Sequence, residues 1–206
     1  PATFEEALTH DTAPVPLLAG STRDEIRLFD LMPGDILPSR WPDLEALLRD
    51  QLGPEHAERI LSAYPRSKKG RIALGSDLTF VMPTRHFAER HAARQPTWFY
   101  RFDYAHPIAG ATHGLDLTLF WPFTGLKMAL ARGGPDSGRR AALGKRMRAH
   151  IASFVKHGNP GDSWPRYEPD DRKVWLYALE DGIAANPEAQ RYAAWAGRDV
   201  EPGRDK

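Results

Sequence analysis

Three short apolar runs, separated by longer stretches with helical spacing, constrain the fold of this chain most. Residues 15–19 are apolar on both faces, which suits a strand buried in a parallel sheet. Residues 97–102 are rich in aromatic side chains and bounded by Pro96 and Asp103, which predicts a central strand. Residues 174–179 predict a last strand. Because helical segments lie between these runs, the sequence predicts an α/β layer architecture.

The helical segments show their limits in the sequence. Leucines at helical intervals predict a helix over 42–52, and Pro54 opens a second one that runs to about residue 64. Ser76 and Asp77 are expected to cap a turn that leads into a helix over 83–94. Apolar residues spaced by three and four from Leu143 to Val155 predict the strongest helix, which ends at Gly158. A short helix is expected over 187–195, and the whole chain, 1–206, is expected to form part of one domain, with a lead-in over 1–14 and a charged tail over 197–206.

Composition excludes several classes of protein. The 28 basic and 27 acidic residues nearly cancel and are interspersed, so no nucleic-acid partner is expected. No apolar run reaches the roughly 18 residues that a membrane span needs, so no membrane partner is expected either. The chain has no cysteine, which excludes disulfides and a cysteine nucleophile within it. The lack of cysteine favours the cytoplasm without settling the location, because the sequence begins at Pro1 and a targeting signal could precede it.

Familiar cofactor and metal motifs are absent from the sequence. There is no P-loop and no G-x-G-x-x-G after a strand, and His86 and His91 lack the H-E-x-x-H pattern of zinc proteases. We therefore expect neither cofactor nor metal. The G-x-S-x-G turn that presents the serine of α/β-hydrolases is also missing, because Gly134-Pro-Asp-Ser-Gly138 has its serine in the wrong place. We interpret six histidines as surface or partly buried polar residues: His10, His56, His86, His91, His150 and His157.

Two loops that follow predicted strands carry residues suited to acid–base chemistry. The first bears Asp24 and Glu25, and the second bears His113 between small residues. Open α/β sheets place their ligands at the carboxyl ends of strands, and a carboxylate there can orient a histidine that acts as a general base. An acid that precedes a histidine matches the second half of the hydrolase order of serine, acid and histidine, so the serine is expected upstream of Pro1. From spacing alone, a solvated acid and a structural histidine remain the alternative.

The two loops lie in longer motifs, Leu17-Leu-Ala-Gly-Ser-Thr-Arg-Asp-Glu25 and Ala109-Gly-Ala-Thr-His113. The first resembles the segment that carries the catalytic acid of type B carboxylesterases, the family of cholinesterases and bacterial para-nitrobenzyl esterases. The second resembles the segment that carries the catalytic histidine of that family. Phe154-Val-Lys-His-Gly-Asn-Pro160 and Trp164-Pro-Arg-Tyr167 resemble the helix end and the motif that follow. The resemblance covers about residues 15–177.

The resemblance implies the C-terminal part of an α/β-hydrolase fold, with a mostly parallel sheet flanked by helices. By position, Glu25 is the triad acid, His113 the triad base, Asp116 a structural partner near the histidine and Asp77 a buried acid at a helix start. Ile26 stands where the family usually has glycine, which is expected to alter the turn behind Glu25.

The implied function is carboxylic ester hydrolysis by a serine esterase with an acyl-enzyme mechanism. An N-terminal segment of the same enzyme is the expected partner, supplying serine and oxyanion hole, and a small ester is the expected substrate. This chain alone is then expected to be inactive. The alternatives are a non-enzymatic protein that uses the hydrolase fold as an interaction surface, and a free-standing binding domain.

Overall fold

The computed structural model describes residues 13–29, 38, 40–107, 109–121 and 136–196. Residues 13 and 14 of the expected lead-in have no regular structure, while the rest of that lead-in and the expected tail lie outside the described residues. Within the described ranges, no helix combines the length and the apolar character that a membrane crossing requires.

Four strands form one sheet in the order β1-β2-β3-β4. Strands β1 (Leu17–Thr22), β2 (Thr97–Phe102) and β3 (Lys173–Tyr177) are parallel, and β4 (Gly182–Ala185) is antiparallel to β3. The central position of β2 and the mostly parallel sheet confirm the prediction. The expectation that 174–179 is the last strand was wrong, because the chain turns back after β3 and adds β4.

Strand β1 lies further along the chain than the apolar run predicted. Its register pairs Leu17 with Thr97 and Thr22 with Phe102, so Gly20 lies inside the strand. A Cβ atom at Gly20 would come within 2.4 Å of the Tyr100 ring. Gly20 therefore marks a close approach between side chain and backbone, not the end of the strand that the sequence suggested.

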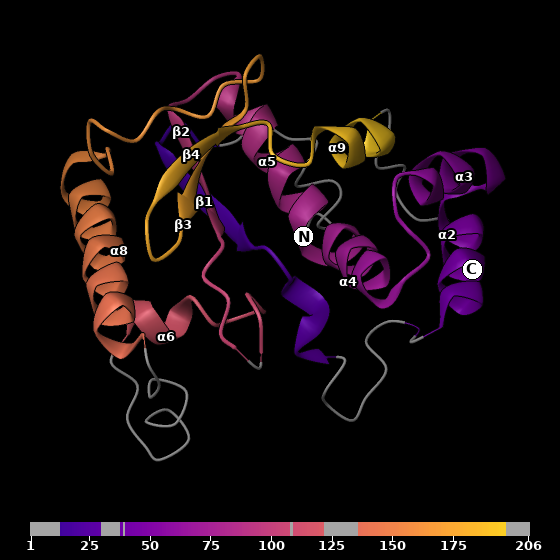
Figure 1. Ribbon diagram of the computed structural model, residues 1–206. Coiled ribbons are helices and arrows are strands. Elements are labelled where there is room, and N and C mark those ends of the chain that lie inside the picture. Colours follow the sequence, from indigo (N-terminus) through magenta and orange to yellow (C-terminus); the bar gives the residue numbers. More distant parts are fainter. Residues whose placement is uncertain (1–12, 30–37, 39, 108, 122–135, 197–206) are drawn as a thin grey trace.

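Helices cover both faces of the sheet (Figure 1). Helix α8 (Ser137–His157) packs Leu143 and Met147 against Trp98 and Phe102 on one face, and it ends at Gly158 in the left-handed conformation, as predicted. Helix α5 (Met82–Ala92) packs Ala88 against Phe99 on the other face. Consecutive residues of β2 thus face opposite helices, as the two-residue period of a strand requires.

A second hydrophobic core lies beside the sheet, among helices that group together in Figure 1. Helices α2 (Trp41–Leu52), α3 (Pro54–Ser62) and α9 (Ala189–Trp195) surround it together with α4 (Lys68–Ser76). The first three agree with the predicted helices to within about two residues. Its buried side chains include Leu44, Leu48, Ile60, Leu74 and Trp195.

The region before Pro83 differs from the prediction. Residues 68–92 are helical throughout, because α4 continues through a π-helical segment, η3 (Asp77–Val81), into α5. Proline lacks the N–H of a helical hydrogen bond and its ring crowds the preceding turn, so the wider π turn accommodates Pro83 inside the run. Asp77 is buried, as the resemblance implied, but it lies within the continuous helix rather than at a helix start.

Candidate active site

Glu25 occupies the first turn after strand β1. It begins the short 3-10 helix η1 (Glu25–Arg27), and its side chain is only 5% exposed. The backbone N–H of Thr22, at the end of β1, donates to Glu25 Oε1 over 2.6 Å. The strand end therefore fixes one oxygen of the carboxylate. The other oxygen faces the loop that carries His113, here called the histidine loop.

His113 meets this second oxygen. Its Nδ1 lies 2.7 Å from Glu25 Oε2, which confirms the predicted contact between the two loops. The imidazole side chain is 46% exposed, and Nε2 has no hydrogen-bond partner among the described residues. The pair thus combines a buried carboxyl group with an imidazole whose second nitrogen has no partner among the described residues.

Burial controls the electrostatics of the acid. Desolvation raises the pKa of the Glu25 carboxyl above its usual value, while hydrogen bonds from the Thr22 backbone and from His113 oppose the rise. The carboxylate is therefore held by two donors in a setting where an unpaired charge would be costly.

Backbone hydrogen bonds join the loop that carries Asp24 and Glu25, here called the acid loop, to the histidine loop. The N–H of His113 donates to the Glu25 carbonyl over 3.2 Å, and the N–H of Asp24 donates to the Ala111 carbonyl over 2.8 Å. Thr112 is buried, and its hydroxyl accepts from the N–H of Leu28 over 2.8 Å and lies 3.4 Å from the Glu25 carbonyl oxygen. These contacts join segments more than 80 residues apart in sequence and set the relative position of the two side chains.

Ile26 is compatible with the turn behind Glu25, although the sequence raised doubt about it. Its φ is not positive, so the turn does not need the conformational freedom of glycine. The side chain is buried, and its N–H donates to the buried Ser76 hydroxyl of helix α4 over 3.2 Å. The expected alteration of the turn therefore leaves the contact between Glu25 and His113 intact.

Asp116 connects the histidine loop to neighbouring elements through both oxygens of its carboxylate. Its Oδ2 accepts from the Tyr100 hydroxyl over 3.0 Å, and its Oδ1 accepts from the N–H of Leu117 at the start of the short helix α6 (Leu117–Phe120). Burial raises the pKa of the Asp116 carboxyl, and the Tyr100 hydrogen bond opposes this. Asp116 thus ties the histidine loop to strand β2.

Two aromatic rings that the sequence analysis missed pack against the imidazole. The Phe80 ring lies with its centroid 4.7 Å from that of His113, and the Phe29 ring lies 5.7 Å away. Phe80 belongs to the π-helical segment η3. No local motif marks these phenylalanines, because both reach His113 through tertiary packing.

The other candidate residues do not join this pair. Asp24 forms an ion pair with Arg23 at 3.3 Å and lies 3.4 Å from the backbone nitrogen of Ala111. His91 is buried and binds the carbonyl of Val15, while His150 contacts the Tyr177 hydroxyl. His10 lies outside the described residues. Among the described ranges, no group of three or more side chains is arranged to hold a metal, and no serine hydroxyl is hydrogen-bonded to His113.

The fold and the paired loops are those of an α/β-hydrolase, and the comparisons agree. A solved thermophilic para-nitrobenzyl esterase superposes with a TM-score of 0.72 at 30% identity, over 87% of this chain and 38% of that one. A carboxylesterase of Geobacillus stearothermophilus, 23% identical, shares the fold with a TM-score of 0.71, over 93% of this chain and 41% of that one.

The sequence comparisons define the family. The model of the Carboxylesterase family matches residues 4–195, so this chain belongs to that family. The para-nitrobenzyl esterase of Bacillus subtilis (strain 168) is 31% identical over 195 residues, which cover 91% of this chain and 39% of the relative. The pyrethroid hydrolase Ces2e of Rattus norvegicus is 25% identical, covering 90% of this chain and 36% of the relative. The chain therefore spans about two fifths of the length of these relatives.

Proposed function

We propose that this chain supplies the acid and the base of a serine esterase that hydrolyses carboxylic esters through an acyl-enzyme. The observation that carries the proposal is the 2.7 Å contact between Glu25 Oε2 and His113 Nδ1. Membership of the Carboxylesterase family supports the reaction class. The nucleophilic serine comes from a segment outside these 206 residues, since the sequence contains no G-x-S-x-G turn.

The roles of the two residues follow from the hydrogen-bond geometry. An ionised carboxylate only accepts hydrogen bonds, so Glu25 holds the proton of His113 on Nδ1 and leaves the lone pair of Nε2 free. Nε2 takes the proton of the serine hydroxyl while the serine oxygen attacks the ester carbonyl. The resulting imidazolium gives that proton to the leaving alcohol, and the same nitrogen then activates the water that releases the acid.

The surroundings of His113 favour this cycle. The buried Glu25 carboxylate stabilises the imidazolium formed during attack. The rings of Phe29 and Phe80 limit the orientation of the imidazole, and an aromatic face also attracts a cation. Asp116 acts through the loop, not on the substrate, because its oxygens are occupied by Tyr100 and Leu117.

An N-terminal segment of the same enzyme is the proposed partner, and a small ester is the proposed substrate. That segment would supply the oxyanion donors as well as the serine, without which no acyl-enzyme forms. Strand β1 is an edge of the described sheet, so its outer side has backbone groups with which a strand of that segment can pair.

A non-enzymatic protein that uses the hydrolase fold for interaction is the second candidate. The contact between Glu25 and His113 counts against it, because an interaction surface has no need of an oriented histidine.

Labelling of the complete protein, including the segment that precedes this chain, tests the proposal. We expect a fluorophosphonate to attach to one serine of that segment and to abolish hydrolysis of a para-nitrophenyl ester. Replacing His113 by Gln should prevent labelling, while the same change at the exposed His157 of helix α8 should not. Equal labelling of both variants would contradict the role of His113 as the base, and no labelling of the wild type would assign the protein to the interaction class.

A further inference from the structure

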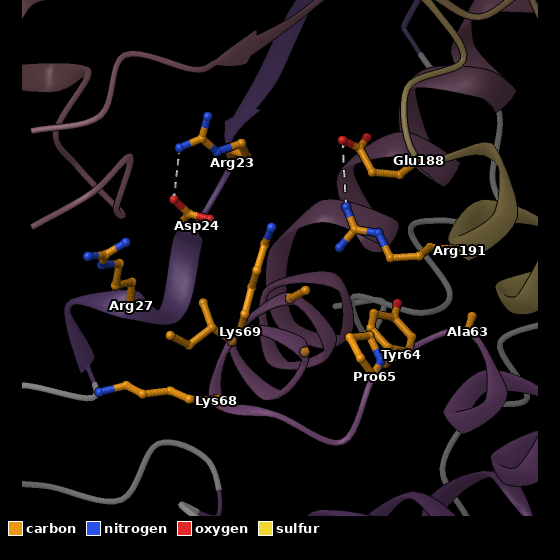
Figure 2. Close-up of a pocket in the computed structure, with 13 residues that line it drawn as sticks. Arg23, Asp24, Arg27, Ala63, Tyr64, Pro65, Lys68, Lys69, Glu188 and Arg191 are labelled. Carbon is orange, nitrogen blue, oxygen red and sulfur yellow. Dashed lines mark hydrogen bonds and ion pairs between the residues drawn. The ribbon is translucent and has the colours of Figure 1, made fainter.

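A large cationic pocket lies beside the acid loop. It has a volume of about 1090 Å³, and neither Glu25 nor His113 is among its lining residues. Its walls come from the acid loop, the turn between α3 and α4, the first turns of α4 and the start of α9, as Figure 2 shows. Four parts of the chain, up to about 170 residues apart, therefore build one cavity.

The pocket combines positive charge with apolar surface. Five cationic side chains and two carboxylates line it: Arg23, Arg27, Lys68, Lys69 and Arg191, with Asp24 and Glu188. The remaining wall includes the side chains of Ala63, Tyr64, Pro65, Ile72 and Ala73. Cations beside a mostly apolar wall suit a ligand that has an anionic group and an apolar body.

The ion pairs show which cation is left to bind a ligand. Arg23 is paired with Asp24 at 3.3 Å, and Arg191 with the buried Asp77 at 3.1 Å. Lys69 forms no ion pair within the described part of the chain. In Figure 2 its side chain extends into the space between Asp24 and Arg191. Lys69 is the second residue of helix α4, where the helix dipole adds to its positive potential.

We propose that this pocket binds an anionic amphiphile, a carboxylate on an extended apolar body, with Lys69 as its main charge partner. A small molecule fits better than an acidic peptide segment, because a peptide would place backbone polar groups without partners against the apolar wall. The site stands on the pocket itself and does not depend on the esterase proposal. Carboxylates are also the class of product that ester hydrolysis releases.

Fluorescence titration with 11-(dansylamino)undecanoic acid tests this site directly. The complete protein is first treated with a fluorophosphonate so that a reactive serine is blocked, and the primary amide of the same probe serves as the neutral control. We expect the acid to bind more tightly than the amide, and its affinity to fall as salt is raised. Failure of the fluorophosphonate to react would count against the esterase alone, since the titration does not need turnover.

Variants locate the binding. Lys69→Glu should weaken binding of the acid about tenfold or more, and Lys69→Gln should weaken it less. Lys156→Glu, at an exposed lysine of helix α8, should leave the affinity within about twofold. Circular dichroism and thermal unfolding confirm that each variant is folded. Equal affinity for acid and amide, an equal loss at Lys69 and Lys156, or no binding by the wild type overturns the proposal. The last result is the one that an acidic segment filling the pocket would give.

Discussion

At the scale of single residues, the contact of 2.7 Å between Glu25 Oε2 and His113 Nδ1 predicts that the carboxylate orients the imidazole. Glu25→Gln keeps the side-chain shape but can present an N–H to His113 and so favour the wrong tautomer. We expect turnover of a para-nitrophenyl ester by the complete enzyme to fall roughly 10³- to 10⁴-fold. Folding should be largely kept, since the desolvation that raises the pKa of this carboxyl is removed with the charge.

Asp24 provides the comparison for this prediction. Asp24→Asn changes the neighbouring acid, which is paired with Arg23 instead of His113. A loss of turnover in Asp24→Asn as large as in Glu25→Gln, or near wild-type turnover in Glu25→Gln, would contradict the assignment of Glu25 as the triad acid.

We expect Thr112 to position His113, because its hydroxyl contacts the backbone of the acid loop at Leu28 and Glu25. Thr112→Val keeps the shape but leaves the N–H of Leu28 without the acceptor that it has at 2.8 Å. We expect kcat to fall about tenfold, with a loss of about 1–3 kcal/mol in the free energy of unfolding. KM should change little, because Thr112 is buried behind the histidine.

A second buried threonine separates stability from positioning. The Thr97 hydroxyl, at the start of β2, donates to the Gln95 carbonyl over 3.1 Å. Thr97→Val therefore removes a buried hydrogen bond at the end of β2 that is remote from the acid loop. It should lower stability without lowering kcat. An equal fall in kcat for both variants would show that Thr112 has only a structural role.

At the scale of elements, helix α8 and strand β3 meet at His150, and we expect this histidine to make stability depend on pH. His150 of α8 contacts the Tyr177 hydroxyl of β3 over 2.9 Å and lies against the rings of Trp164 and Trp175. Desolvation lowers the pKa of His150 below its usual 6.5. The charge of Asp181 raises this pKa and the charge of Arg146 lowers it. The unfolded chain therefore binds a proton at this residue at a higher pH than the folded chain does.

The sign of the effect follows from this difference. The contribution of His150 is fully present above pH 6.5, and it is lost as the pH falls from there to the lower folded-state pKa. Between pH 8 and pH 5, the free energy of unfolding in urea should fall more in the wild type than in His150→Gln. His157→Gln, at an exposed histidine of the same helix, should follow the wild type. Identical pH dependence in His150→Gln and the wild type would contradict this prediction.

The elements that the sequence predicted well are those with a strong local signal. Helix α8 carries a long apolar repeat and a terminal glycine, and β2 is an aromatic run bounded by Pro96. The helical run through Pro83 could not be predicted, since a proline usually marks a first turn and only packing stabilises the π segment before it. Strand β4 was missed because its four residues gain their structure by pairing with β3.

The site shows the same division. The motifs around Glu25 and His113 give both residues, because each motif is local. The contacts of Thr112, Ser76 and Phe80 join segments 33 to 84 residues apart, and no short pattern reports such pairings.

At the scale of the whole molecule, the described sheet has β1 at one edge, and this is the strand that leads into the acid loop. An uncovered parallel edge presents unpaired N–H and C=O groups, and its apolar faces favour association. The proposed serine segment would both cover this edge and complete the catalytic site. Folding and activity of these 206 residues should therefore depend on the same partner.

Residues 1–206 produced alone should show no esterase activity above background, because an acid and a base accelerate acyl transfer only beside a positioned nucleophile and oxyanion donors. They should also self-associate through the open edge, or form a complex when the preceding segment is produced with them. Size-exclusion chromatography and fluorophosphonate labelling measure both properties, with circular dichroism to confirm helix and strand content. A folded monomer with a labelled serine on this chain would contradict both expectations, because none of its serines lies in a G-x-S-x-G turn.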